Sequence, residues 1–334
     1  MSKYSDIQLR YADKRIAFLG ASIFQNGRFL QYMRSVMAGD FHAPKLLNCG
    51  LGGNRSIMAK YLLEDEIVAL NPDVCFVHFG VNDMGVWLYD AQLAKTEELL
   101  AERLNRNAVY LQGMREIVDG LKRHGIAPVL CSPIAVNELL QEDENVETLA
   151  DNKEKGERIG NSFYQKKTFA RINDALKEYG RQVKQIGEET NCVFCDLFVQ
   201  TYALMKSKGG LYGKDGIHLT ADGQTELGKI LLQFLGWETP ADAPKENSIP
   251  AEIAALEATD RKIQYVKWAM FNPFLGYRTV DLEENVKKEY QESDLPAHKK
   301  VAIETYWEMG AQREQVRAEI ERLLAKLQTA SLGW

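Results

Sequence analysis

Four short polar segments carry the residues that could do chemistry, and they are spread over most of the chain. The first contains Ser22, in the run RIAFLGASIFQN, and the last contains Asp215 and His218, in the run DGIH. A serine becomes a nucleophile when a histidine takes its proton, and that histidine needs an acceptor on its other ring nitrogen. The three-residue spacing lets Asp215 supply this acceptor if the segment forms one tight turn. These residue types therefore predict nucleophilic catalysis at a serine.

The two middle segments carry groups that stabilise a negatively charged intermediate. The run GLGGN ends in Gly53 and Asn54, and the run GVND contains Asn82 and Asp83. Backbone N–H groups of a glycine loop and the amide of an asparagine are donors suited to an oxyanion hole. Each segment alone also fits a structural role, since Ser22 could cap a helix and the glycine and asparagine segments could be plain turns. Their order along the chain decides between these interpretations.

The elements expected around these segments bring them to one edge of a sheet. Apolar strand-like runs alternate with helical patterns, which is typical of a parallel sheet with helices on both faces. The predicted strands are residues 15–19, 44–49, 74–79, 127–131 and 192–197. Loops at the carboxyl ends of such strands converge on one crevice. Ser22, Gly53 and Asn82 each follow a predicted strand, and Asp215 and His218 precede the last helix of the sheet domain, so we expect them to meet there.

Helical patterns between the predicted strands complete a layered α/β arrangement. Apolar residues recur at helical spacing in residues 27–37, 55–70, 91–124, 169–190 and 220–237. Residues 132–162 form instead a long, highly charged segment after a predicted strand. Such a segment is usually a solvated surface insertion, but at this edge of a sheet it can also be a lid or a substrate wall.

The chain changes character after Trp237. Residues 238–249 are rich in proline and charge and indicate a linker or exposed loop. Helical patterns follow over residues 252–271 and 297–328, the second with the heptad-like series Val316, Ile320, Leu323 and Leu327. We therefore predict a sheet domain over residues 1–237 and a helical hairpin within residues 238–334. This hairpin either packs on the sheet domain or joins subunits into a homo-oligomer.

The bulk composition limits the classes of function. The net charge of −6 and the pI near 5.6 argue against a nucleic-acid partner and against an anionic membrane surface. No apolar run approaches the roughly 20 residues of a membrane span. The first 15 residues are polar and charged, without the pattern of a signal peptide. From these features we expect a cytoplasmic protein.

The cysteines and histidines show no pattern that requires a metal or a cofactor. Cys192 and Cys195 form a C-x-x-C, but it lies in a strand-like run without a second cysteine pair. We interpret the five thiols as reduced and mostly buried. The histidines have no ligand-like spacing relative to His218. We expect neither a metal nor a cofactor.

Taken together, the four segments resemble the SGNH (GDSL-type) hydrolases. This family has a serine in a Gly-Asp-Ser turn, a glycine in a second block, a Gly-x-Asn-Asp block and a late Asp-x-x-His. The matching runs here are Gly20-Ala21-Ser22, NCGLGGN over residues 48–54, GVND over residues 80–83 and DGIH over residues 215–218. The resemblance covers about residues 14–237, and the last two blocks match fully. It implies a flavodoxin-like three-layer α/β/α fold.

The resemblance also implies catalytic roles, residue by residue. Ser22 matches the nucleophile, His218 the general base and Asp215 the residue that orients the base. The sequence departs from the family at Ala21, where an aspartate is usual. That aspartate is not a member of the catalytic triad, so the nucleophile is not put in doubt. Its replacement removes a polar contact near the turn and marks a divergent subfamily.

The same resemblance implies an oxyanion hole built from three donors. These are the backbone N–H groups of Ser22 and Gly53 and the side chain of Asn82. Gly53 precedes Asn54, as the family's glycine often precedes an aspartate or asparagine, and Gly52 is the alternative donor.

Aromatic and amide side chains near the predicted site suit the face of a sugar, and the resembled family includes many carbohydrate deacetylases. The predicted substrate-binding residues are Asn54, Arg55, Asp83 and Trp87. The sequence thus predicts a serine esterase for a small-molecule ester, most simply one that removes O-acetyl groups from a carbohydrate. One alternative is a lysophospholipase or acyl-thioesterase with the same triad. Another is a non-catalytic binding protein on the same scaffold.

Overall fold

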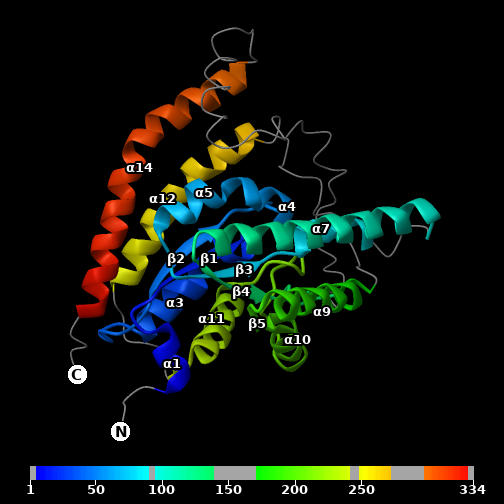
Figure 1. The fold of residues 1–334 in the computed structure, drawn as a ribbon, viewed down its shortest axis with the longest axis horizontal. Coiled ribbons are helices and arrows are strands. Elements are labelled where there is room, and N and C mark those ends of the chain that lie inside the picture. The colour runs from blue at the N-terminus through cyan, green and yellow to red at the C-terminus, as the bar shows by residue number, and fades with distance from the viewer. Residues whose placement is uncertain (1–4, 90–94, 139–170, 241–247, 272–296, 330–334) are drawn as a thin grey trace.

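Five parallel strands form one sheet in the order β2-β1-β3-β4-β5 (Figure 1). They are β1 (Arg15–Gly20), β2 (Lys45–Gly50), β3 (Val74–His78), β4 (Ala127–Cys131) and β5 (Val193–Cys195). The computed structural model describes residues 5–89, 95–138, 171–240, 248–271 and 297–329. The nearly continuous apolar runs of the inner strands are those of a sheet covered on both faces. The predicted α/β fold with a five-stranded parallel sheet is confirmed.

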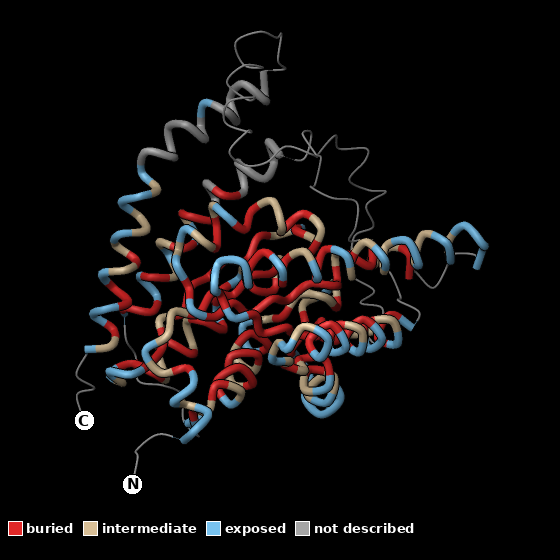
Figure 2. The backbone as a smooth tube through the Cα atoms, viewed as in Figure 1, coloured by how far each residue is buried: buried red, intermediate tan, exposed pale blue. Residues whose placement is uncertain are grey.

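Helices cover both faces of the sheet and make three layers. One layer contains α1 (Asp6–Tyr11), α3 (Arg28–Val36) and α11 (Ala221–Leu235), and the other contains α4 (Ser56–Ala59), α7 (Glu97–Arg123) and α9 (Ile172–Thr190). Successive strand residues serve opposite layers, so that Phe18 packs in the first and Leu19 in the second. Figure 2 shows the buried residues gathered in the sheet and on the inner sides of these helices, while the amino-terminal turns of α7 are exposed.

Residues 55–70 depart from the single helix that their apolar spacing predicts. The structure divides them into α4, a 3₁₀ turn (Lys60–Leu62), α5 (Leu63–Glu66) and a second 3₁₀ turn (Val68–Leu70). Two buried polar residues in the segment have distant partners: Ser56 bonds to Asp83, and Glu66 pairs with arginines of the C-terminal helices. These tertiary contacts fix the segment's course and override its helix propensity.

Among the described residues, two helices longer than one turn lie where the sequence patterns predicted none. They are α1, which begins with a capping box at Ser5, and α10 (Leu197–Ser207), which is capped by the side chain of Asp196. Of the charged segment over residues 132–162, the part beyond residue 138 lies outside the described residues, as does the predicted turn after residue 271. No helix in the described ranges combines the length and apolar character needed to cross a membrane.

The C-terminal helices α12 (Ser248–Phe271) and α14 (Ala297–Thr329) lie side by side along the β2 edge of the sheet (Figure 1). Apolar residues at the carboxyl-terminal end of α14, among them Leu323 and Leu327, are buried in contact with the sheet domain. The backbone N–H of Gly39 donates to the carbonyl of Leu327 at 3.0 Å. Of the two predicted roles, the described part of the hairpin performs the first, packing on the sheet domain. Assembly into oligomers and the domain boundary at residue 237 stay predictions.

Candidate active site

Ser22 lies immediately beyond the carboxyl end of β1, where the chain turns into the one-turn helix α2 (Ser22–Gln25). The turn requires a glycine at position 20, because a Cβ there would lie 2.8 Å from the carbonyl oxygen of His78. As the first residue of α2, Ser22 has a backbone N–H without an intrahelical acceptor. Ala21 precedes it and makes no side-chain cap. The serine hydroxyl and its own N–H therefore stand at the edge of the sheet predicted for the site.

His218 connects Ser22 to Asp215. Its Nε2 lies 2.9 Å from the Oγ of Ser22, and its Nδ1 lies 2.6 Å from the Oδ2 of Asp215. The imidazole is thus held at both nitrogens, one by the hydroxyl and one by the carboxylate. Its side chain is 38% exposed, so the ring can exchange protons with a substrate or water. Residues 196 positions apart in the sequence meet here in the order that a serine-histidine-aspartate relay needs.

A tight turn holds Asp215 and His218 together. The Oδ1 of Asp215 accepts hydrogen bonds from the backbone N–H groups of Ile217 and His218, both at 2.9 Å. Gly216 inside the turn has a φ of +70°, a conformation that favours glycine. Partial burial raises the pKa of Asp215. The hydrogen bonds from the ring and backbone of His218 and from the backbone of Ile217 together lower this pKa by more than burial raises it, so the net pKa is below its ordinary value. The carboxylate is therefore ionised at neutral pH.

The predicted oxyanion donors differ in their present hydrogen bonds, and of these donors Asn82 lines a cavity together with Ser22. Asn82, in α6 (Val81–Met84), donates one amide hydrogen to the carbonyl of Asn54 at 3.0 Å, which fixes its side chain and leaves its second N–H available. The N–H of Gly52 donates to the side chain of Gln25. The N–H of Gly53 makes no hydrogen bond with the described residues. Of the two candidate glycines, Gly53 is therefore the one with a free donor.

A small cavity of about 10 Å³ opens beside Ser22. It is lined by Ala21, Ser22, Ile23, Asn54, His78, Phe79, Gly80, Val81, Asn82 and Ile217. A cavity of this size admits roughly one water-sized group. Apart from Ser22 and the two asparagines, its wall is largely apolar. The space next to the serine thus fits a group as small as a methyl.

The four predicted substrate-binding residues occupy different environments. Asn54 lines the cavity and is buried, and its Nδ2 has no hydrogen-bond partner in the described part of the chain. Arg55 is half-buried beside it. Asp83 is buried, and its two carboxylate oxygens accept from Ser56 and from the N–H of Gly80, so it braces the loop and is not open to a ligand. Trp87 lies away from the cavity, with the guanidinium of Arg106 4.6 Å above its ring.

Two residues that the sequence motifs did not assign to the site fasten its loops together. Gln25, on α2, accepts from Gly52, and Asn48, at the end of β2, donates to the carbonyl of Gln25 and accepts from the N–H of Gly50. A Cβ at Gly50 would lie 2.2 Å from the backbone nitrogen of Gln25, so only glycine permits this close approach. The turn that contains Ser22 and the glycine loop are therefore held together as one fixed unit.

His78 is a third unassigned residue at the site. It ends β3, is 2% exposed and stacks on Phe24 at 4.8 Å, and neither of its ring nitrogens has a hydrogen-bond partner among the described residues. Burial lowers the pKa of His78 to about 4, so the ring is neutral at pH 7. The signal available in the sequence was a histidine in the otherwise apolar run VCFVHF.

No metal cluster accompanies these residues. Within the described ranges, no three His, Cys, Asp or Glu side chains are grouped to hold a metal ion. The five cysteines are free thiols, and all but Cys192 are buried.

Comparison with known proteins places the chain in a family. The GDSL-like lipase/acylhydrolase family matches residues 17–225, which contain Ser22, Asn82, Asp215 and His218. The chain belongs to this family. Membership supports a carboxylic ester hydrolase that acts on a small-molecule ester, in agreement with the predicted class.

Individual relatives are more distant. The chain is 25% identical over 199 residues to an acetylxylan esterase from Geobacillus stearothermophilus, a match over 58% of this chain and 73% of the relative. A crystal structure of an acetylxylan esterase from that organism has a TM-score of 0.49 at 21% identity, covering 69% of this chain and 98% of that one. A gut microbial diltiazem-metabolizing enzyme has a TM-score of 0.65 at 14% identity over 95% of both chains. This last likeness shows a shared fold that includes the C-terminal helices.

Proposed function

We propose that the chain is a serine esterase in which Ser22 is the nucleophile, His218 the general base and Asp215 the residue that orients the base. The observation that carries this proposal is the position of the His218 ring, 2.9 Å from the serine oxygen and 2.6 Å from the carboxylate. Asp215 accepts from Nδ1, which leaves Nε2 as the proton acceptor facing the hydroxyl.

The reaction proceeds through an acyl-enzyme. The Oγ of Ser22 bonds to the ester carbonyl carbon as its proton passes to Nε2 of His218. The tetrahedral intermediate collapses, the bond to the leaving oxygen breaks, and His218 gives its proton to the departing alcohol. Water then adds to the acyl carbon with His218 as base, and the carboxylic acid leaves as Ser22 recovers its proton.

The oxyanion of each tetrahedral intermediate is stabilised by the N–H of Ser22, the N–H of Gly53 and the amide of Asn82. Two features support this assignment: Gly52 is already engaged by Gln25, and Asn82 is held in place by Asn54. Donors fixed before the reaction need no reorganisation as charge develops, which is the main source of their catalytic effect.

The acyl group is short, most simply an acetyl carried on a carbohydrate hydroxyl. The cavity of about 10 Å³ beside Ser22 supports this, because a long acyl chain needs an extended apolar groove. The relative named as an acetylxylan esterase supports the carbohydrate part of the proposal. The alternatives are a lysophospholipase or acyl-thioesterase with the same triad, and a non-catalytic binding protein.

A series of p-nitrophenyl esters with two, four, eight and sixteen acyl carbons tests the acyl length. We expect kcat/KM to be greatest for the acetyl ester and to fall as the chain grows. A maximum at eight carbons or more would favour the lysophospholipase or thioesterase alternative. Absence of turnover with every ester, including acetylated xylo-oligosaccharides, would favour the binding protein.

A further inference from the structure

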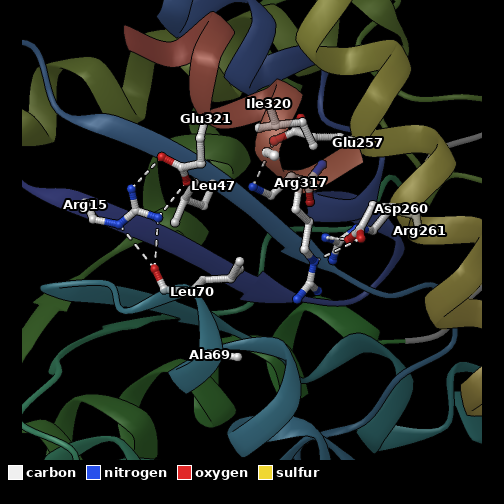
Figure 3. A pocket seen from close by; sticks show the side chains of 12 residues that line it. Arg15, Leu47, Ala69, Leu70, Glu257, Asp260, Arg261, Arg317, Ile320 and Glu321 are labelled. Carbon is white, nitrogen blue, oxygen red and sulfur yellow. Dashed lines mark hydrogen bonds and ion pairs between the residues drawn. The ribbon is translucent and has the colours of Figure 1, made fainter. Parts of the chain in front are cut away.

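A second, larger cavity of about 270 Å³ lies between the sheet and the C-terminal helices (Figure 3). Its walls come from β1, β2, the segment before β3, α12 and α14. The lining residues are Arg15, Leu47, Asn48, Ala69, Leu70, Glu257, Asp260, Arg261, Arg317, Ala318, Ile320 and Glu321. None of them lines the cavity beside Ser22. This space is therefore separate from the candidate active site.

The carboxylates on its wall are already paired with arginines. Arg15 binds both oxygens of Glu321, at 2.7 and 2.8 Å. Both oxygens of Asp260 accept from arginines; burial raises the pKa of this carboxyl, but the arginines around it lower the pKa further, so it stays ionised. Glu257 is held in the same way by Arg34. Each of these oxygens already accepts at least one charge-assisted hydrogen bond.

Donors, in contrast, remain unused. Arg317 donates from Nε to Asp260 and from one terminal nitrogen to Glu66, while its other terminal nitrogen, Nη1, makes no hydrogen bond with the described residues. Figure 3 shows this guanidinium reaching from α14 toward the space between Arg15 and Arg261. Arg261 is buried, and its Nε has no partner among the described residues. A ligand that pairs with these unused N–H groups must therefore supply a hydrogen-bond acceptor.

The charges around the cavity also favour a ligand that supplies hydrogen-bond acceptors. Among the described residues, the ion pairs surrounding it join five arginines to four carboxylates, an excess of one positive charge within this set. Arginine keeps its charge at every accessible pH. Apart from Asn48, the remaining wall is apolar, formed by Leu47, Ala69, Leu70, Ala318 and Ile320. A matching ligand has a single negative charge on acceptor oxygens and a compact apolar body.

We propose that this cavity binds a small organic carboxylate, with the carboxylate on Arg317 and the apolar body against Leu70 and Ile320. A carboxylate supplies the acceptor oxygen that Nη1 of Arg317 lacks, and a hydrogen bond between two ionised groups is stronger than one between neutral groups. A single charge balances the excess, and the apolar wall favours a hydrocarbon body over a fully hydrated inorganic anion.

Isothermal titration calorimetry with benzoate tests the proposal, with benzamide as the neutral molecule of nearly the same shape. We expect saturable binding of one benzoate and no measurable binding of benzamide at equal ionic strength. Arg317→Gln should weaken benzoate binding on the order of tenfold, the effect of one charge-assisted hydrogen bond. Arg322→Gln, an exposed arginine on the same helix, should leave it unchanged.

Two further variants keep the test decisive. Ala318→Trp narrows the cavity from an exposed helix position without removing an ion pair, so it should abolish binding even if Arg317→Gln does not fold. Ser22→Ala should retain full binding, because the site is not the catalytic one. Equal binding of benzoate and benzamide, unchanged binding in Ala318→Trp, or no binding of benzoate to the parent protein would each overturn the proposal.

Discussion

Two clusters of polar side chains join distant parts of this chain, and they differ in burial and in charge. The candidate active site joins Ser22 to Asp215 and His218, with the histidine side chain 38% exposed. The cluster beneath the C-terminal helices joins Arg34 to Glu257, with side chains only 1% and 5% exposed. The first leaves its reactive atoms open to substrate. The second encloses its charges and matches nearly all of them with one another.

The difference shows what each cluster does. A catalytic site gains from groups that are held in place and yet accessible, so short turns position the residues and solvent reaches the ring. Buried ion pairs gain little net stability, but removing one partner leaves a buried charge uncompensated. We therefore expect the ion-pair cluster to fix where α12 and α14 dock on the sheet domain, and the proposed catalytic cluster to contribute activity without contributing much stability.

The largest expected effect falls on catalysis. His218→Ala removes the base and should lower kcat on the order of 10⁴–10⁶, with little change in the thermal midpoint. His124→Ala is the matched control and should keep the parent kcat, because this exposed histidine follows the carboxyl end of α7, away from the proposed triad. Steady-state kinetics on p-nitrophenyl acetate with a parallel melting curve measures both quantities. Turnover of the ester by His218→Ala at the parent rate would contradict the assignment of His218 as the general base.

The opposite behaviour is expected in the ion-pair cluster. Glu257→Ala leaves Arg34 buried without its partner and should lower the free energy of unfolding by about 3–5 kcal/mol. Replacing both residues, as Arg34→Met with Glu257→Leu, should recover much of that loss, since no lone charge remains. Urea denaturation compares the three proteins. A Glu257 variant as stable as the parent would show that this pair does not hold the hairpin.

The expected effect of His78 on the free energy of unfolding is smaller and depends on pH. Burial holds its pKa at about 4 in the folded protein, against an ordinary histidine pKa of 6.5, so the unfolded chain takes up its proton first as the pH falls. The contribution of His78 to stability is thus constant above pH 6.5 and is lost between about 6.5 and 4. The total change is about 3 kcal/mol.

His78→Phe should remove this dependence while keeping the stack on Phe24. Urea denaturation at several pH values between about 7 and 4 gives the free energy of unfolding of the variant and of the parent, and the difference between the two gives the contribution of His78. The exposed histidine variant His42→Gln is the control and should keep the parent's fall in stability. A parent-like pH profile in His78→Phe would contradict the assignment of a buried neutral ring.

The sequence predicted the parts that depend on local patterns. Strand runs and their order predicted the sheet, and the four motifs predicted which loops meet, because the carboxyl ends of parallel strands share one edge. The turn that joins Asp215 to His218 depends on neighbours three residues apart, so spacing alone indicated it. The uninterrupted helix expected over residues 55–70 was wrong, because the partners of Ser56 and Glu66 lie far away in sequence.

The long-range partners outside the four motifs could not be predicted from the sequence, for a common physical reason. Nothing near Glu257 indicates that it will pair with Arg34, and nothing near Gln25 indicates that it will accept from Gly52. Each contact depends on how two separately folded segments are brought together. Asp83 illustrates the same limit: its motif suggested a ligand contact, whereas the fold buries it against Ser56.

The most direct test of the central claim is covalent labelling of the nucleophile. The protein is treated with a fluorophosphonate, and the modified peptide is located by mass spectrometry while residual esterase activity is followed. We predict one label per chain, on Ser22, with activity lost in proportion to labelling and no label in Ser22→Ala. Labelling of a different residue together with loss of activity, or full esterase activity in Ser22→Ala, would contradict the account.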